Sequence, residues 1–258
     1  MGFGIQSVFG DTYNSLGMVF KSEPTVCIFE PHPSYTTKSS EIMLAAENSV
    51  QLWEDVLHEY SPNGNWNFDV FTVPIEYHHT EDAYAFPSCD ILIAFEFTND
   101  TYALGYTHMN FSKSWHKYSQ STIFLNAIEL TPIIEKEAEG NGSIMIGTKL
   151  SISELAIPVI QNIITHEFGH ALGLGHYNIT DYPIYTDDRP WQEASVMYYS
   201  LDEEDEELTT PTYVDIMMLE KLYYYDGFGG TPVTNIPKVG YYSPGDEDIC
   251  TFKCKVWQ

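Results

Sequence analysis

The stretch His166–His176, with the sequence HEFGHALGLGH, constrains this chain more than any other feature. His166 and His170 are four residues apart, so on a helix they share one face and can reach a single metal ion. Glu167 lies beside that face. Gly173 allows the chain to leave the helix sharply, and His176 can then return as a third ligand. Three protein ligands with a fourth position left for water are typical of catalytic rather than structural zinc.

A second motif follows the first in the chain. The pattern H-E-x-x-H-x-x-G-x-x-H resembles the zinc signature of the metzincin metallopeptidases, which also have a methionine-containing turn further on. Residues 195–199, Ser-Val-Met-Tyr-Tyr, are similar to that Met-turn. The resemblance is strongest over about residues 150–226 and extends, as an order of elements, back to about residue 25.

The resemblance implies a role for each site residue. His166, His170 and His176 would bind one Zn²⁺, and Glu167 would be the general base toward a metal-activated water. Met197 would form a hydrophobic floor below the ligands. Tyr199, two residues further on, would contact the zinc or the oxyanion; the alternative is an ordinary packing tyrosine.

The fold class that the resemblance implies is α+β. It has a twisted mixed sheet with a backing helix and a zinc helix above a cleft, and a smaller irregular lower lobe with a C-terminal helix. We expect an irregular segment over 1–23, the catalytic domain over 24–230 with its upper lobe ending at about 175, and a tail with two cysteines over 231–258.

Hydrophobic patterns predict the elements of this fold. Helices are expected over 41–59, with Ser39 or Ser40 as the cap, over 153–172, and after Thr209 or Thr210. Strands are expected over 25–30, 66–75, 90–97, 103–108 and 121–128. Gly169 lies in the middle of the zinc helix, where glycine costs about 1 kcal/mol relative to alanine. A close approach by metal-site neighbours would explain it.

In metzincins an exposed edge strand lines the cleft, and here the run around residues 104–106 would be that edge. An extended protein or peptide substrate can add to such an edge as a further strand. The alternative for this run is an ordinary loop.

The charge of the chain limits its partners. Asp plus Glu total 37 and Lys plus Arg total 11, giving a net charge of −26. Such a surface repels phosphate backbones and anionic lipid, which argues against nucleic-acid and membrane partners. The chain contains no apolar run long enough to span a bilayer. We expect a monomer.

Four cysteines permit two disulfides, with the pairing left open by the sequence. They are Cys27, Cys89, Cys250 and Cys254, and four N-x-[ST] sequons accompany them. These features favour a secreted or extracellular protein, although the first twenty residues do not form a signal segment.

A second metal has less support. Matrixins hold a structural zinc with three histidines and an aspartate before the catalytic helix. His78, His79, Asp82, His108 and His116 lie in that interval, but the His-Gly-Asp context is absent and scattered surface histidines are favoured. A structural Ca²⁺ is likewise unsupported.

The subfamily and the activity leave alternatives. Tyr177, directly after the third histidine, matches neither matrixins, astacins nor serralysins, and the long segment before Met197 is closer to the last two. The sequence favours a zinc endopeptidase. The alternatives are a noncatalytic binding module on the same scaffold, an exopeptidase, and a zinc hydrolase acting on another bond.

Overall fold

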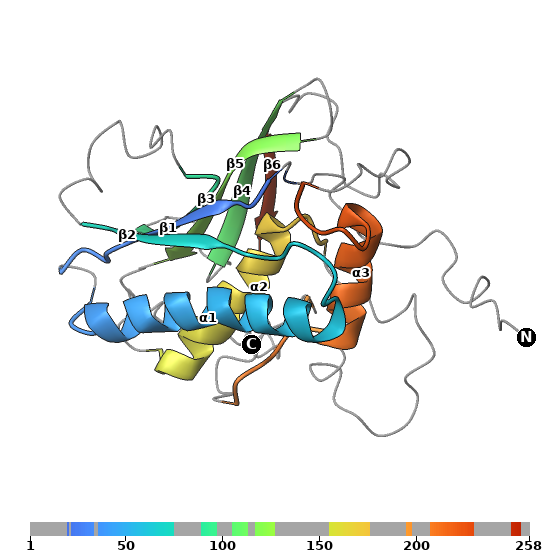
Figure 1. Cartoon of the computed structure of the whole chain (residues 1–258). Helices are drawn as coiled ribbons and strands as arrows, with labels where there is room; N and C mark the ends of the chain where they lie inside the picture. Colours follow the sequence, from blue (N-terminus) through green and yellow to red (C-terminus); the bar gives the residue numbers. More distant parts are fainter. Residues whose placement is uncertain are drawn as a thin grey trace, which may run out of the picture.

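The computed structural model describes the sheet, the three helices and the turns that join them at the core (Figure 1). The described residues are 20, 22–33, 36–74, 89–96, 105–112, 117–126, 155–175, 195–197, 207–229 and 249–253. For Glu96, for residues 117–126 and 249–253, and for residues 105–112 apart from Thr107, the description covers the backbone alone.

Six strands form one mixed sheet in the order β2-β1-β3-β5-β4-β6. The strands β1 (Thr25–Phe29), β2 (Asp69–Val73), β3 (Ile91–Glu96) and β5 (Lys117–Asn126) are parallel to one another. The strand β4 (Gly105–Ser112) is antiparallel to β5 on one side and to β6 (Ile249–Lys253) on the other.

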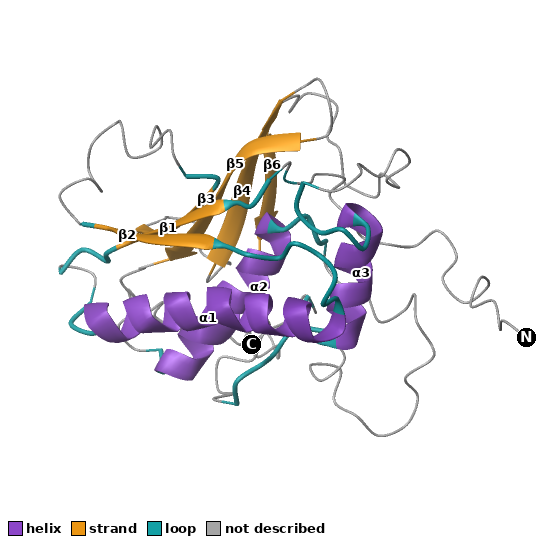
Figure 2. Cartoon of the chain, in the orientation of Figure 1, coloured by secondary structure: helices purple, strands orange, loops and turns teal. Residues whose placement is uncertain are grey.

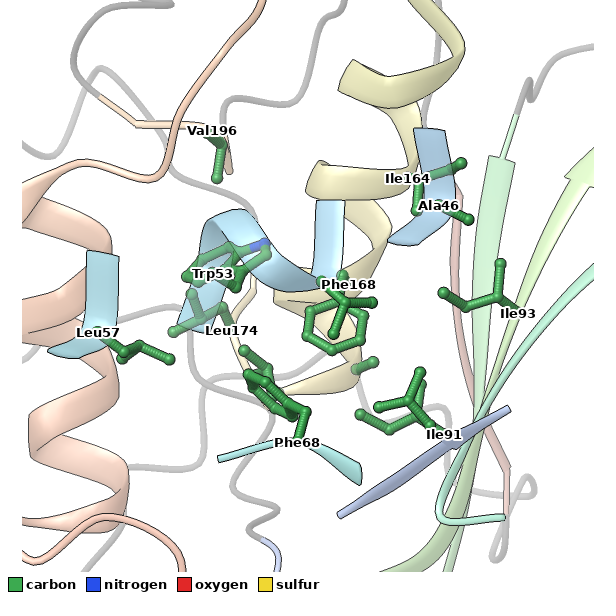
Figure 3. Close-up of a cluster of buried hydrophobic side chains, with 14 of the residues drawn as sticks. Ala46, Trp53, Leu57, Phe68, Ile91, Ile93, Ile164, Phe168, Leu174 and Val196 are labelled. Atoms are coloured by element: carbon green, nitrogen blue, oxygen red, sulfur yellow. The ribbon is translucent and has the colours of Figure 1, made fainter. Parts of the chain in front are cut away.

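Alternation along the strands divides the sheet into two faces. Val26 and Ile28 of β1 belong to the main core, whereas Cys27 and Phe29 belong to a smaller cluster. The main core lies between the sheet and the helices (Figure 3), and it includes Ile91 and Ile93 of β3, Trp53 and Phe168.

Two helices cover this face of the sheet and pack against each other (Figure 2). They are α1 (Ser39–Tyr60) and α2 (Ile157–Ala171). The buried side chains of α1 recur at intervals of three and four residues, as an amphipathic helix requires. Trp53 Nε1 donates to the carbonyl of Thr165 at 2.8 Å, and Thr165 Oγ1 donates to Ser49 Oγ at 3.1 Å. These bonds set the position of α2 directly before His166.

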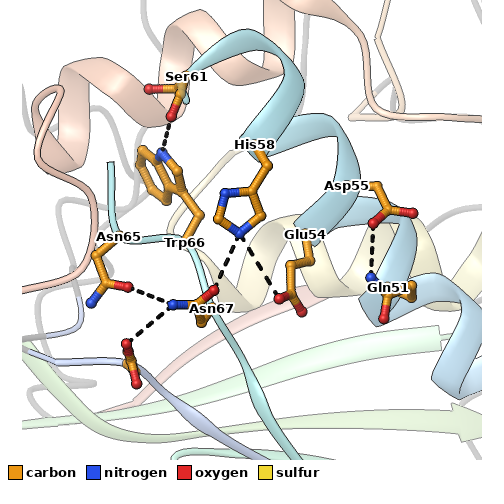
Figure 4. Close-up of polar contacts among 9 residues, drawn as sticks. Gln51, Glu54, Asp55, His58, Ser61, Asn65, Trp66 and Asn67 are labelled. Carbon is orange, nitrogen blue, oxygen red and sulfur yellow. Dashed lines mark hydrogen bonds and ion pairs between the residues drawn. The ribbon is translucent and has the colours of Figure 1, made fainter. Parts of the chain in front are cut away.

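The third helix, α3 (Tyr213–Tyr223), is fixed at both ends. After the helix, Gly227 has a φ of 70° and its backbone lies close to that of Asn65. The N–H of Asn65 donates to the carbonyl of Asp226 at 2.9 Å, and the carbonyl of Asn65 accepts from the N–H of Phe228 at 2.7 Å. Asn65 belongs to the turn that ends α1, where Trp66 Nε1 donates to the carbonyl of Ser61 at 3.0 Å (Figure 4). The ends of α1 and α3 are therefore joined through backbone bonds.

The predicted elements are present, with shifted ends. Helix α2 begins at Ile157 rather than 153, because Pro158 has no backbone N–H to donate and suits the first turn of a helix. The cap of α3 is Thr212 rather than Thr209 or Thr210. Helix α1 begins at Ser39 with Lys38 at the cap position, rather than Ser39 or Ser40 as predicted, and it ends at Tyr60.

One prediction about the sheet is wrong. The run around residues 104–106 begins β4, as a strand, but β4 is not the edge, because β6 pairs with it along Tyr106–Asn110. Residues 249–253, which lie in the predicted tail, are thus part of the sheet. Their β-branched and aromatic composition, ICTFK, is a strand signal that the sequence reasoning did not use.

A disulfide joins Cys27 of β1 to Cys89, which precedes β3. This bond is one of the two disulfides that four cysteines permit. The side chain of Cys250 and the whole of Cys254 lie outside the description. The two cysteines are 62 residues apart in the sequence, and their bond links the neighbouring strands β1 and β3.

Replacing both Cys27 and Cys89 by alanine should lower the free energy of unfolding by about 2–4 kcal/mol, since the open chain regains loop entropy when it unfolds. Urea unfolding of the two proteins measures the difference. Wild-type protein fully reduced before unfolding is the matched control and should give the same loss. An unchanged midpoint in the double variant would contradict the stabilising role.

Candidate metal centre

Helix α2 brings three of the predicted site residues together in the core. The side chains of His166, Glu167 and His170 are all fully buried. The two imidazole rings meet edge to face, with centroids 4.8 Å apart and planes at 88°. The four-residue spacing therefore places both histidines on one face, as the sequence predicts.

Each histidine is oriented by a backbone carbonyl. His166 Nδ1 lies 2.6 Å from the carbonyl oxygen of Val196, and His170 Nδ1 lies 2.8 Å from that of Leu174. A carbonyl only accepts, so Nδ1 carries the proton in both rings and Nε2 carries the lone pair. Metal-binding histidines have this arrangement, with one nitrogen hydrogen-bonded and the other as ligand. The two described imidazoles can therefore supply two ligands of a zinc ion, while His176, the predicted third ligand, lies outside the described residues.

The turn after α2 supplies one of these carbonyls. Gly173 has a φ of 102°, a conformation that favours glycine. The N–H of Gly173 donates to the backbone carbonyl of His170 at 2.9 Å, and the N–H of Leu174 donates to the carbonyl of Gly169 at 3.0 Å. These two bonds form a Schellman motif. The predicted exit of the chain at Gly173 is confirmed. The turn also carries the carbonyl of Leu174 back to the His170 ring.

Met197 lies against α2 at Gly169. A Cβ on Gly169 would collide with Met197 Sδ and would lie 3.0 Å from Trp53 Cζ2. The close approach expected at this glycine is therefore present, and alanine, the better helix former, would not fit without a shift. Met197 is fully buried beside the histidine helix, and its role as the floor of the metal site stays a prediction.

The buried carboxylate of Asp215, for which no role was predicted from the sequence, holds the Met-turn at residues 195–197. Asp215 accepts from Ser195 Oγ at 2.5 Å, from the N–H of Val196 at 3.2 Å and from the N–H of Thr212 at 2.8 Å. Thr212 and Asp215 also form the capping box of α3. The signal was present as Thr-x-x-Asp before an apolar run, a variant of the capping-box pattern. One side chain thus starts a helix and fixes the Met-turn.

Burial raises the pKa of Asp215 to about 6, while its hydrogen bonds to Ser195, Thr212 and Val196 act in the opposite direction. The carboxyl group therefore takes up a proton more readily in the folded protein than in the unfolded chain.

Glu167 has a partner on the sheet. Thr107 of β4 is fully buried, and its Oγ1 lies 2.6 Å from Glu167 Oε2 and 3.0 Å from the backbone oxygen of Glu167. Sixty residues separate the two, and no local pattern in the sequence connects them. Only the packing of β4 on α2 shows the contact.

Several predicted residues lie outside the described part of the chain. His176 and Tyr199 are among them, as are His78, His79, Asp82 and His116. His108 lies in β4, where the backbone alone is described. The third ligand and the role of Tyr199 therefore stay predictions, and the preference for scattered surface histidines over a second metal is untested.

Comparison with known proteins agrees with the fold. A mixed sheet above a buried H-E-x-x-H helix, with a methionine turn beneath it, defines the metzincin class of zinc metallopeptidase domains. The matrixin family model matches residues 21–224, and the chain belongs to the matrixin family. A search of curated proteins gave no significant match. Among the described residues, no helix has the length and apolar character needed to cross a membrane.

The family match decides between branches that the sequence left open. The long segment between His176 and Met197 favoured astacins or serralysins, yet the model that matches is that of the matrixins. The length of a segment between two motifs is a weak criterion, because insertions between packed elements are accepted more readily than insertions within them. Matrixin membership implies zinc-dependent endopeptidase activity on protein substrates.

The titration of Asp215 predicts a pH effect on stability. Between pH 5 and 7.5 the folded protein binds a proton at Asp215 that the unfolded chain does not, so this contribution is present at low pH and is lost as the pH rises through 6. The free energy of unfolding of the wild type should therefore fall over this interval by about 1 kcal/mol more than that of Asp215→Asn.

Urea unfolding of both proteins at the same zinc concentration measures this difference. Subtracting the two pH profiles cancels the other carboxylates, which are common to both. Parallel profiles would contradict the raised pKa. Asp215→Asn should also be less stable at neutral pH by about 1–3 kcal/mol, because its NH₂ group faces backbone and hydroxyl donors.

Proposed function

We propose that this matrixin is a zinc-dependent endopeptidase in which His166, His170 and His176 hold the ion and Glu167 is the general base. The observation that carries the proposal is the orientation of two buried imidazoles by backbone carbonyls, with the buried Glu167 between them in sequence. A glutamate and two histidines fixed in this way suit hydrolysis rather than a purely structural metal site.

The chain's own residues would divide the work as follows. Glu167 would take a proton from the attacking water and pass it to the leaving amine. Burial of the site would exclude bulk water and strengthen each electrostatic contact. When bound, zinc supplies Lewis-acid polarisation of the scissile carbonyl and makes water a better proton donor. Tyr199 is retained as a candidate for stabilising the oxyanion.

The substrate would be a protein or peptide bound in an extended form. The sequence supports a protein that acts outside the cell as a monomer, and the Cys27–Cys89 disulfide is consistent with an oxidising compartment. The net charge of −26 would disfavour acidic substrates and favour basic ones at long range.

Digestion of a peptide library, followed by mass spectrometry, tests the proposal. The zinc-loaded wild type should cleave internal bonds, and Glu167→Gln should lower kcat by about 10²–10⁴-fold because the base is lost while the side-chain shape is kept. The zinc content of the two proteins should be equal.

Three outcomes would contradict the proposal. Undiminished cleavage by Glu167→Gln would exclude the general-base role. Cleavage only at chain ends would indicate an exopeptidase. A zinc-loaded protein that cleaves no member of the library, with residues 249–258 present or deleted, would indicate a binding module.

A further inference from the structure

We infer that Thr107 of β4 is a positioning residue that orients the carboxylate of Glu167; this rests on the proposed role of Glu167 as general base. The Thr107 hydroxyl is 2.6 Å from Glu167 Oε2, a length typical of an O–H group bonded to a carboxylate. Both side chains are fully buried.

The geometry restricts Glu167 in two ways. A glutamate has three rotatable side-chain bonds, and a single anchored oxygen removes most of that freedom. Thr107 Oγ1 also lies 3.0 Å from the backbone oxygen of Glu167, so one hydroxyl contacts both ends of the same residue. The carboxylate is thereby held at a fixed place relative to the α2 backbone.

The bond also offsets the cost of burying the carboxylate. A buried charged group is expensive unless hydrogen bonds replace its water. Asp215, the other fully buried carboxylate described at this site, accepts from Thr212 at its own helix end and from Ser195 and Val196 of the Met-turn. Glu167 instead receives its hydroxyl donor from the sheet, so the position of β4 controls the geometry of the base.

Three variants test this inference. Thr107→Val removes the hydroxyl and keeps the shape, Thr107→Ser keeps the hydroxyl, and Thr72→Val makes the same change at an exposed site on β2. Thr107→Val should lower kcat by about 10–100-fold with KM changed less than about twofold. Thr107→Ser and Thr72→Val should stay within about threefold of the wild type.

A double-mutant cycle separates positioning from a general packing defect. In a Glu167→Gln background, Thr107→Val should add little to the loss, since no carboxylate remains to be oriented. Zinc affinity, measured by chelator competition, should be unchanged in Thr107→Val because the histidines have their own carbonyl partners.

Full activity of Thr107→Val, an equal loss in Thr107→Ser, or additive losses in the cycle would each overturn the inference. A zinc-loaded protein that cleaves no peptide even after deletion of residues 249–258 would overturn the proposed function itself, which is a different result.

A second inference comes from the sheet. We propose that β6 occupies the strand position along β4 that an extended peptide substrate needs, so that the chain inhibits itself; this also rests on the proposed function. The pairing runs antiparallel from Tyr106↔Lys253 to Asn110↔Ile249. Thr107, which contacts Glu167, pairs with Phe252 within this run.

The two sides of β4 leave no other strand position at this site. One side pairs with β5 along Gly105–Ser112 and the other with β6. An added strand needs a row of unpaired backbone groups, and an edge that is already paired cannot provide it. A peptide that binds beside Thr107 must therefore displace β6.

A cross-link tests this proposal in the whole chain. Met109 faces Cys250 in the register, so Met109→Cys in a Cys254→Ser background, which leaves Cys250 without its neighbouring cysteine, should form a disulfide between β4 and β6, identifiable by mass spectrometry of the digested protein. The oxidised variant should lose at least about tenfold in kcat/KM, and mild reductant should restore it. Met109→Ser with the same reductant is the control.

Removal of β6 should have the opposite effect. Deleting residues 249–258, or replacing Thr251 by proline to break the pairing, should raise kcat/KM at least about tenfold. A cross-link that does not form, or one that leaves activity unchanged, would overturn the proposal. Variants without β6 that bind zinc but cleave no peptide would overturn the proposed function, and this device with it.

Discussion

The bond between His166 Nδ1 and the carbonyl of Val196 is the contact on which the rest of the site depends. It joins the histidine helix to a turn thirty residues further along the chain. That turn is held by Asp215, and the helix that carries Asp215 is bonded to the end of α2 through Tyr223, whose hydroxyl donates to the carbonyl of Leu172 at 2.9 Å. The orientation of one ring therefore requires α2, the Met-turn and α3 to be packed together.

Two carboxylates buried in the same region are satisfied in different ways. Asp215 is bonded by backbone and hydroxyl groups of Thr212 and by Ser195, so it mainly joins local segments. Glu167 is bonded by Thr107, from a strand sixty residues away. A structural carboxylate such as Asp215 joins the start of α3 to the Met-turn, and only its hydrogen bonds matter for that role. A reactive one must be placed relative to the sheet on which the substrate would bind.

The pairing of β6 with β4 bears on how a substrate could reach the site. Its order without β6 would leave β4 as an edge next to Glu167, where a peptide can add as a strand. With β6 present, the same backbone groups are used within the chain. Open edges are a hazard in stable proteins and are commonly covered. In this molecule the covering strand and the expected substrate require the same position.

The sequence by itself determined the zinc helix, the positions of its histidines on one face, the exit at Gly173 and the order of strands and helices from β1 to α3. These features depend on local periodicity and on glycine's backbone freedom, which act over a few residues. Tertiary structure alone decided that Thr107 contacts Glu167, that Asp215 holds the Met-turn, that Cys27 pairs with Cys89 and that β6 covers β4. These contacts join residues between about 20 and 150 positions apart, because packing a sheet on two helices brings together segments that no local pattern links.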